Sequence, residues 1–159
     1  MKIVKGNLLD LAEAGDFDII VQGCNCFNTM GGGIAREIRE RYPEVAAVDA
    51  ATLSGDYNKL GNWTKEQVIR KNGTVDFTVI NAYTQYDMSR GTDVFEYESF
   101  VLILKKLIHF YPKARYGFPF IGMGLAGGDK NIILEILGQF DESITEAGGT
   151  FTLVEFEQK

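Results

Sequence analysis

Two glycine-rich segments carry the residue types best suited to ligand chemistry. The first, "GCNCFNTMGGGIAREI" at 23–38, contains two cysteines, two asparagines and three consecutive glycines, with no charged side chain before Arg36. The second, "GMGLAGGD" at 122–129, contains no lysine or arginine. Glycine lets the backbone approach a ligand closely and permits conformations in which successive N–H groups converge on one anion. We interpret both segments as loops that hold a phosphate or pyrophosphate with main-chain donors.

The glycines could instead serve only the tight turns that join strands to helices, and for a single glycine run that explanation would be as good. Two such segments in one chain favour anion binding. No Lys-Ser or Lys-Thr pair follows either glycine run, so a P-loop is excluded.

Runs rich in β-branched and aromatic residues, ending in turn residues, predict the strands that lead into these loops. They lie at 2–7, 17–25, 115–122 and 150–157. Between 60 and 85, two more such runs flank an Asn-Gly pair, which is the strongest short signal for a β-hairpin.

Apolar residues at three- and four-residue steps predict helices after the loops. One begins at Gly32 and is broken or restarted at Pro43, a second spans 95–111, and a third spans 130–147 before a pair of glycines. Strands alternating with helices predict one α/β domain over 1–159, a three-layer α/β/α sandwich with a mixed, mostly parallel central sheet. In such sheets the ligand crevice lies beyond the carboxyl ends of the strands, where both glycine segments fall.

Composition limits the partners. The chain has 159 residues, a net charge of -6 and a pI of about 4.8, so nucleic acid is not expected as a primary partner. No apolar run is long enough for a membrane span, and we expect a cytoplasmic protein that does not contact membranes. Cys24 and Cys26 are expected to be reduced, small hydrophobic residues. With one histidine, His109, far along the chain, no metal site is expected, and no cofactor either.

Several blocks in order along the whole chain resemble the macrodomain family, which binds ADP-ribose. They are "KGN" at 5–7, "CNCFNTMGGGIA" at 24–35, "NAYTQ" at 81–85 and "PFIGMGLAGGD" at 119–129. Within that family the chain most resembles the yeast-type ADP-ribose 1''-phosphate phosphatases, and it is similar to the terminal ADP-ribose glycohydrolase branch. The resemblance implies ADP-ribose or ADP-ribose 1''-phosphate as the ligand, and it leaves ADP-ribosylated macromolecules open as partners.

The resemblance also implies which residues contact that ligand. It assigns the adenine end, the distal ribose with its neighbouring phosphate, and the pyrophosphate to separate parts of the chain. The implied contacts are Asn7, Leu8 and Phe156 for adenine, Asn25, Gly31, Gly32, Gly33, Ile34 and Ala35 for the ribose loop, Gly122, Met123, Gly124, Leu125 and Ala126 for the pyrophosphate, and Thr84 within "NAYTQ".

Two of these adenine contacts have competing explanations. Many relatives carry Asp where this chain has Asn7; its amide oxygen can still accept from the adenine amino group, but without charge, and a turn-forming role competes. Phe156 shares a strand face with Val154, so a core position is as well supported as stacking on adenine.

Catalysis would need an aimed water and stabilised charge. The candidates are Asn25, which can orient water or hold ribose hydroxyls, and Asp129, for which a helix N-cap is the stronger interpretation. His109 falls on the polar face of its helix and is expected on the surface.

The chain also departs from the enzymes that it resembles. Related enzymes often carry His at the position of Gln22, and other ADP-ribosyl hydrolases have Asp at that of Ala35. The glycohydrolase branch uses an acidic residue near Ala126 and a lysine near "NAYTQ", and this chain has neither. Three hypotheses follow: a phosphatase acting on ADP-ribose 1''-phosphate, a reader that binds ADP-ribose without turnover, and a glycohydrolase that removes ADP-ribose from protein or DNA. The departures count most against the third.

Overall fold

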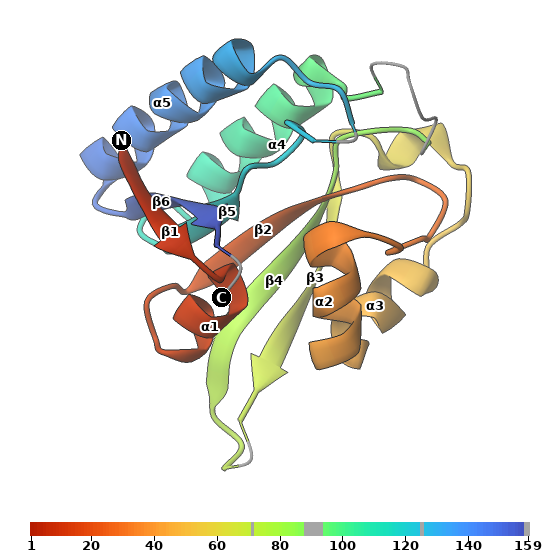
Figure 1. The fold of residues 1–159 in the computed structure, drawn as a ribbon, viewed down its shortest axis with the longest axis horizontal. Helices are drawn as coiled ribbons and strands as arrows, with labels where there is room; N and C mark the ends of the chain where they lie inside the picture. The colour runs from red at the N-terminus through yellow and green to blue at the C-terminus, as the bar shows by residue number, and fades with distance from the viewer. Residues whose placement is uncertain (71, 88–93, 125, 158–159) are drawn as a thin grey trace.

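The computed structural model describes residues 1–70, 72–87, 94–124 and 126–157, and its strands form one six-stranded sheet (Figure 1). The strands are β1 (Lys2–Gly6), β2 (Ile19–Cys24), β3 (Trp63–Ile69), β4 (Val75–Tyr83), β5 (Arg115–Pro119) and β6 (Thr150–Phe156). Their order is β1-β6-β5-β2-β4-β3, and every neighbouring pair is parallel except the β3–β4 hairpin. The predicted α/β class and the mixed, mostly parallel sheet are confirmed.

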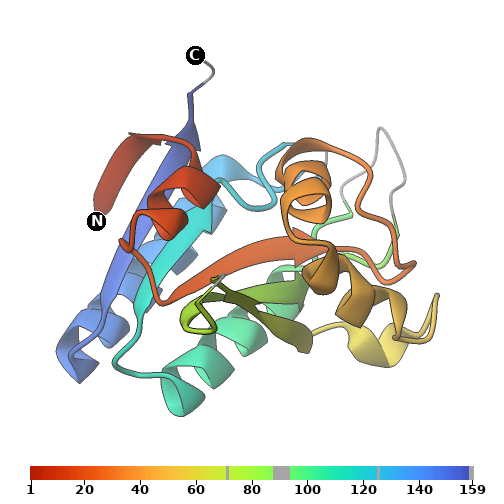
Figure 2. The ribbon, with the colours of Figure 1, turned by 90° about the horizontal axis from the view of Figure 1, so that it is seen from below.

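Helices cover both faces of this sheet. They are α1 (Leu8–Glu13), α2 (Gly33–Arg41), α3 (Pro43–Ala50), α4 (Tyr97–Phe110) and α5 (Lys130–Ala147), with a short 3-10 helix, η1 (Tyr57–Lys59). Figure 2 shows α4 and α5 on one face and α1, α2 and α3 on the other, which is the predicted three-layer arrangement. Pro43 is the first residue of α3, so it restarts the helix, as its fixed φ and missing N–H favour.

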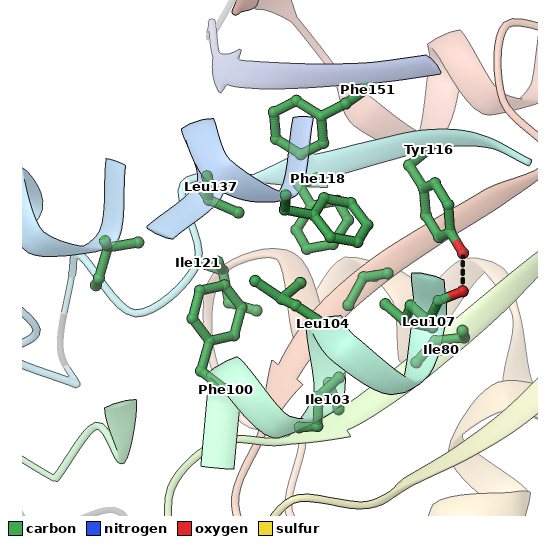
Figure 3. Packing of buried hydrophobic residues seen from close by; sticks show 14 of the residues in the cluster. Ile80, Phe100, Ile103, Leu104, Leu107, Tyr116, Phe118, Ile121, Leu137 and Phe151 are labelled. Atoms are coloured by element: carbon green, nitrogen blue, oxygen red, sulfur yellow. Dashed lines mark hydrogen bonds between the residues drawn. The ribbon is translucent and has the colours of Figure 1, made fainter. Parts of the chain in front are cut away.

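The larger core cluster fills the space between the sheet and the α4–α5 layer. Phe118 is fully buried, with its ring 5.3 Å from that of Phe151 (Figure 3). The ring of Phe140 lies 5.6 Å from that of Phe118. Tyr116 donates its hydroxyl to Leu107 O at 3.2 Å, so its polar end is satisfied inside the core. Replacing one such ring with alanine would lower the free energy of unfolding by about 3–5 kcal/mol. This layer therefore contributes strongly to the stability of the fold.

A second cluster lies under α1, α2 and α3, and a third, smaller one lies beneath the loop that follows β2. In β2, Ile19, Ile20 and Val21 are all buried, as a central strand covered on both faces requires. The third cluster consists of Cys24, Cys26, Met30 and Tyr83. This cluster packs beneath the loop that leads into α2.

The predicted helices and strands are confirmed, and two elements were missed. The third predicted helix, 130–147, coincides with α5. The missed elements are α1 and η1, whose six and three residues are too short to show a helical period. Within the described residues, no helix combines the length and the apolar character that crossing a membrane requires.

Candidate functional site

The loop between β2 and α2 presents a row of main-chain N–H groups. In the described part of the chain, no acceptor binds the N–H groups of residues 31–35. The first amides of any helix lack intrahelical partners, and the N-cap residue here, Gly32, has no side chain to cap them. These groups also carry the positive end of the α2 dipole, so together they can hold an anion without a cationic side chain.

The second glycine loop joins β5 to α5 and is held by Phe95. Gly122 has φ +74, and a Cβ atom there would lie 2.5 Å from the Phe95 ring, so only glycine fits without displacing that ring. Ala126 O accepts from the N–H groups of Val94 and Phe95 at 3.0 and 3.2 Å. Phe95 is itself buried against Phe100. Phe95 therefore links this loop to the core.

This second loop also exposes main-chain donors. No described residue accepts from the N–H groups of Gly124 and Ala126, and around Gly124 there is open space. Met123 is half-buried against the large core cluster. Leu125, a predicted contact, lies outside the described residues.

The two loops meet over a cavity of about 240 Å³, which we call the loop cavity. Its lining comes from the end of β2, the first loop and the start of α2, with Ala126 from the second loop and two residues from the segment after β4. The lining residues are Gly23, Cys24, Asn25, Thr29, Gly31, Gly32, Ala35, Gln85, Val94 and Ala126. Apart from the Cys24 thiol, none of these described residues carries a titratable side chain.

A second cavity of about 360 Å³, the apolar cavity, opens on the other side of the first loop, between β1, β6 and α2. It is lined by Gly6, Asn7, Leu8, Gly33, Ile34, Glu37, Pro119, Phe120, Val154 and Phe156. Residues 31–35 thus divide between the two cavities, and their unpaired amides lie at the boundary. A ligand with a flat apolar group, an anionic centre and a polar end would fit this order of features.

Phe156 has an exposed fraction of 66%, so the core position considered from the sequence is wrong. Its side chain lines the apolar cavity, as do those of Leu8 and Ile34. Phe120, which sequence reasoning missed, lines the same cavity. Two aromatic rings are therefore available to a flat ligand there.

Asn25 organises the first loop and also faces the loop cavity. Its Oδ1 accepts from Phe27 N at 2.8 Å, and its Nδ2 donates to Thr29 Oγ1 at 2.7 Å and to Thr29 O at 3.2 Å. Asn25 is 7% exposed. Oδ1 keeps one lone pair beyond these contacts, so Asn25 can accept from one ligand or water hydrogen.

Lys59, which sequence reasoning also missed, holds the first loop through hydrogen bonds from its buried ammonium group. It is 8% exposed, and its Nζ donates to Cys26 O at 2.9 Å, Asn28 Oδ1 at 2.6 Å and Leu53 O at 3.2 Å. All three hydrogens of the ammonium group are used. Nothing in the local sequence signals this role, because Lys59 lies more than thirty positions away from the loop that it holds.

Beneath the loop cavity the side chains are buried and polar. Gln22 Nε2 donates to Asn81 Oδ1 at 2.8 Å. Related enzymes often have His at this position, whereas in this chain Gln22 forms a hydrogen-bonded pair of amide side chains. Thr84, a predicted contact, is 1% exposed and lines neither cavity. Its hydroxyl instead lies 2.9 Å from where a Cβ on Gly23 would stand, which makes it part of the floor. The geometry therefore corrects the expectation of a direct contact from Thr84.

Asp129 caps α5, as the stronger sequence interpretation holds. Its Oδ1 accepts from Asn131 N at 2.9 Å and Ile132 N at 3.2 Å. It lines neither cavity, so its position does not support the alternative catalytic role. His109 is exposed in the last turn of α4, as expected.

Asn7 caps α1. Its Oδ1 accepts from Leu9 N at 2.9 Å and from Asp10 N at 3.0 Å. The competing turn-forming role from the sequence is thus realised as the N-cap of the missed helix α1, and both lone pairs of the amide oxygen are occupied. The expectation that this oxygen accepts from adenine is corrected.

The cysteines are poorly suited to nucleophilic chemistry. Burial raises the pKa of the Cys24 thiol, and the nearby Asp49 carboxylate raises it further. Burial likewise raises the pKa of Cys26. No group of three or more His, Cys, Asp or Glu side chains among the described residues is arranged to hold a metal ion.

Comparisons with known proteins give one relative in sequence and several in structure. No protein-family model matches the chain. It is 31% identical over 150 residues, 91% of this chain and 92% of the other, to an uncharacterized 17.5 kDa protein in the tk-vs intergenic region of Enterobacteria phage T4. It superimposes with a TM-score of 0.68 and 18% identity on the macrodomain of Mycobacterium tuberculosis DarG, covering 98% of each chain. It also superimposes, with a TM-score of 0.67 and 16% identity, on a Trypanosoma brucei macrodomain in complex with ADP-ribose, covering 98% of this chain and 63% of that one.

Proposed function

We propose that this chain, which belongs to the same protein family as the 17.5 kDa phage T4 protein and has the macrodomain fold, binds ADP-ribose across the apolar and loop cavities. Adenine occupies the apolar cavity between Phe120 and Phe156. The diphosphate bridge lies over the amides of residues 31–35, and the distal ribose enters the loop cavity beside Asn25. The observation that carries this proposal is the row of unpaired amides between the two cavities.

The proposed activity is removal of the phosphate from ADP-ribose 1''-phosphate. The terminal phosphate would lie at the distal ribose, where Ala126, which lines the loop cavity, offers a further N–H group. Water attacks phosphorus, the ester oxygen leaves with a proton, and the amides stabilise the charge that develops on the phosphoryl oxygens. Asn25 orients the water through the free lone pair of Oδ1.

A reader that binds ADP-ribose without turnover is the second candidate, and one observation favours it. The described lining of the loop cavity holds no carboxylate or imidazole to take a proton from water, and the pKa of the Cys24 thiol is raised. A phosphatase working through amides alone would therefore be slow, and a reader needs no base at all.

Binding is tested by calorimetric titration with ADP-ribose, using Gly32→Glu as the blocking variant. Gly32 has φ -147, which any residue adopts, and a Cβ there meets nothing within 4 Å, so the variant should fold. Its carboxylate would repel the diphosphate, and we expect affinity to fall at least about a hundredfold. Gly138→Glu on α5 is the matched control, because Gly138 also has open space and lines neither cavity.

Unchanged affinity of Gly32→Glu would contradict this binding mode, and absence of binding by the parent protein would contradict the function. Turnover is measured separately as phosphate released from ADP-ribose 1''-phosphate. The phosphatase proposal predicts release that Asn25→Ala abolishes. Tight binding of ADP-ribose with no release would leave the reader as the function.

A further inference from the structure

The apolar cavity contains a single carboxylate. Among its described lining residues, Glu37 is the only one with a charged side chain, and Asn7 is the only other one with a polar side chain. Glu37 lies one turn into α2, and its side chain is 30% exposed. The sequence alone did not single out this residue.

The position of this carboxylate is fixed from two sides. Glu37 Oε1 accepts from Asn7 Nδ2 at 3.0 Å and from Arg41 Nη2 at 3.0 Å. Arg41 is held in turn by Asp10, with Nη1 and Oδ1 2.8 Å apart. Within the described residues, Glu37 Oε2 has no hydrogen-bond partner. One oxygen is thus anchored, and the other remains available as an acceptor.

Asn7 cannot supply that acceptor itself. Its amide oxygen already receives two N–H groups at the start of α1, and its nitrogen donates to Glu37. An N–H donor on a flat ligand in this cavity therefore finds only the Glu37 carboxylate among the described side chains.

On the basis of the proposed function, we propose that Glu37 is the base-specificity residue of this chain, with Oε2 accepting a hydrogen from the exocyclic amino group of adenine. Asn7 is then a positioning residue that acts through Glu37. A carboxylate on α2 takes over a contact that the asparagine after β1 cannot make. A hydrogen bond to a charged group is worth roughly twice a neutral one, so it can discriminate between bases.

The test compares two ligands and three proteins by calorimetry. The ligands are ADP-ribose and its analogue with unsubstituted purine, which lacks the amino group and has no N–H donor on that edge. The proteins are the parent, Glu37→Gln, and Glu40→Gln as the matched control on the same helix, where Glu40 pairs with the exposed Arg36 at 3.1 Å.

Glu37→Gln should be a strong perturbation with little change in shape. The donors from Asn7 and Arg41 both require the amide oxygen, so the amide NH₂ takes the place of Oε2 and presents a donor where adenine needs an acceptor. We expect the parent to bind ADP-ribose at least about tenfold more tightly than the analogue. Glu37→Gln should lose about tenfold for ADP-ribose and nothing for the analogue, whereas Glu40→Gln should match the parent.

Equal binding of the two ligands by the parent would overturn the inference without any variant. An equal loss of affinity for both ligands in Glu37→Gln would also overturn the inference, because the carboxylate would then contact the ribose hydroxyls. An unchanged affinity of Glu37→Gln for ADP-ribose would overturn it as well. In each case ADP-ribose still binds, so the proposed function stands. Failure of the parent to bind either ligand would instead contradict the proposed function.

Discussion

At the scale of single residues, two adjacent glycines at the start of α2 have different tasks. Gly33 has φ +57, in the left-handed region, whereas Gly32 has φ -147, an extended conformation open to any residue. The turn at Gly33 leads the first loop into α2. The amides before and after this turn belong to residues that line the two different cavities. The sequence shows three glycines in a row but not which of them the backbone requires.

This difference predicts the effect of adding one methyl group. Gly33→Ala should lower the free energy of unfolding by about 1 kcal/mol, because alanine is strained at this φ. Gly32→Ala should change it by no more than about 0.5 kcal/mol, because its Cβ would stand in open space. Urea unfolding of both variants measures this. Equal losses would mean that φ at Gly33 does not hold the loop.

Side-chain identities at the site were only partly predictable. The cap at Asp129 follows from a short-range pattern, since it bonds to amides within three positions, whereas Asn25 was assigned to the site by the resemblance to macrodomains. The contact between Asn7 and Glu37 joins residues thirty positions apart, and it depends on how α1 packs beside α2. No local pattern encodes such a contact.

At the scale of elements, the first loop depends on the segment that contains η1. Lys59, at the end of η1, bonds the loop at Cys26 and Asn28. Its ammonium group also lies 5.1 Å from the centre of the Tyr83 ring, which belongs to the cluster under the loop. The first loop is thus held by a buried cation, while its unpaired amides at residues 31–35 have no cationic side chain beside them in the described lining of the loop cavity.

Lys59→Met should therefore weaken both folding and binding. It keeps the aliphatic stem but removes three hydrogen bonds from the ammonium group, one buried and two partly buried, which should cost roughly 2–4 kcal/mol in the free energy of unfolding. We also expect weaker ADP-ribose binding, because the loop loses its anchor. Thermal unfolding and calorimetry measure the two effects.

Lys65→Met is the matched control for this prediction. Lys65 also bonds one oxygen and lies over an aromatic ring, that of Tyr111, but at an exposed position. Its loss should cost no more than about 0.5 kcal/mol. If the two variants were equally stable, Lys59 would not be an anchor.

At the scale of the whole molecule, the sequence predicted the architecture well because regular elements follow from local periodicity. The apolar spacing predicted α5, and the pair of glycines after it marked its end. Asn72-Gly73 predicted the hairpin and lies in the turn between β3 and β4. The strand order is a long-range property, since β1 pairs with the last strand of the chain. The alternation of strands and helices placed both glycine segments beyond the carboxyl ends of the strands, and the resemblance to macrodomains assigned the individual ligand contacts.

The acidic charge of the whole chain, -6, is consistent with this site. In the proposed binding mode the anion is held by main-chain donors within one loop, and this mode requires no basic surface. Because the donors belong to the backbone, most side-chain substitutions leave them in place. Only changes that fill the space above them or redirect the loop should remove binding.

The central claim is that the amides between the two cavities hold the diphosphate of ADP-ribose. The most direct measurement is an NMR titration of the ¹⁵N-labelled chain with ADP-ribose, following each backbone N–H. We predict saturable changes that are largest at residues 31–35, with Gly124 and Ala126 next. Saturable binding that leaves these signals unmoved while others shift would contradict the account.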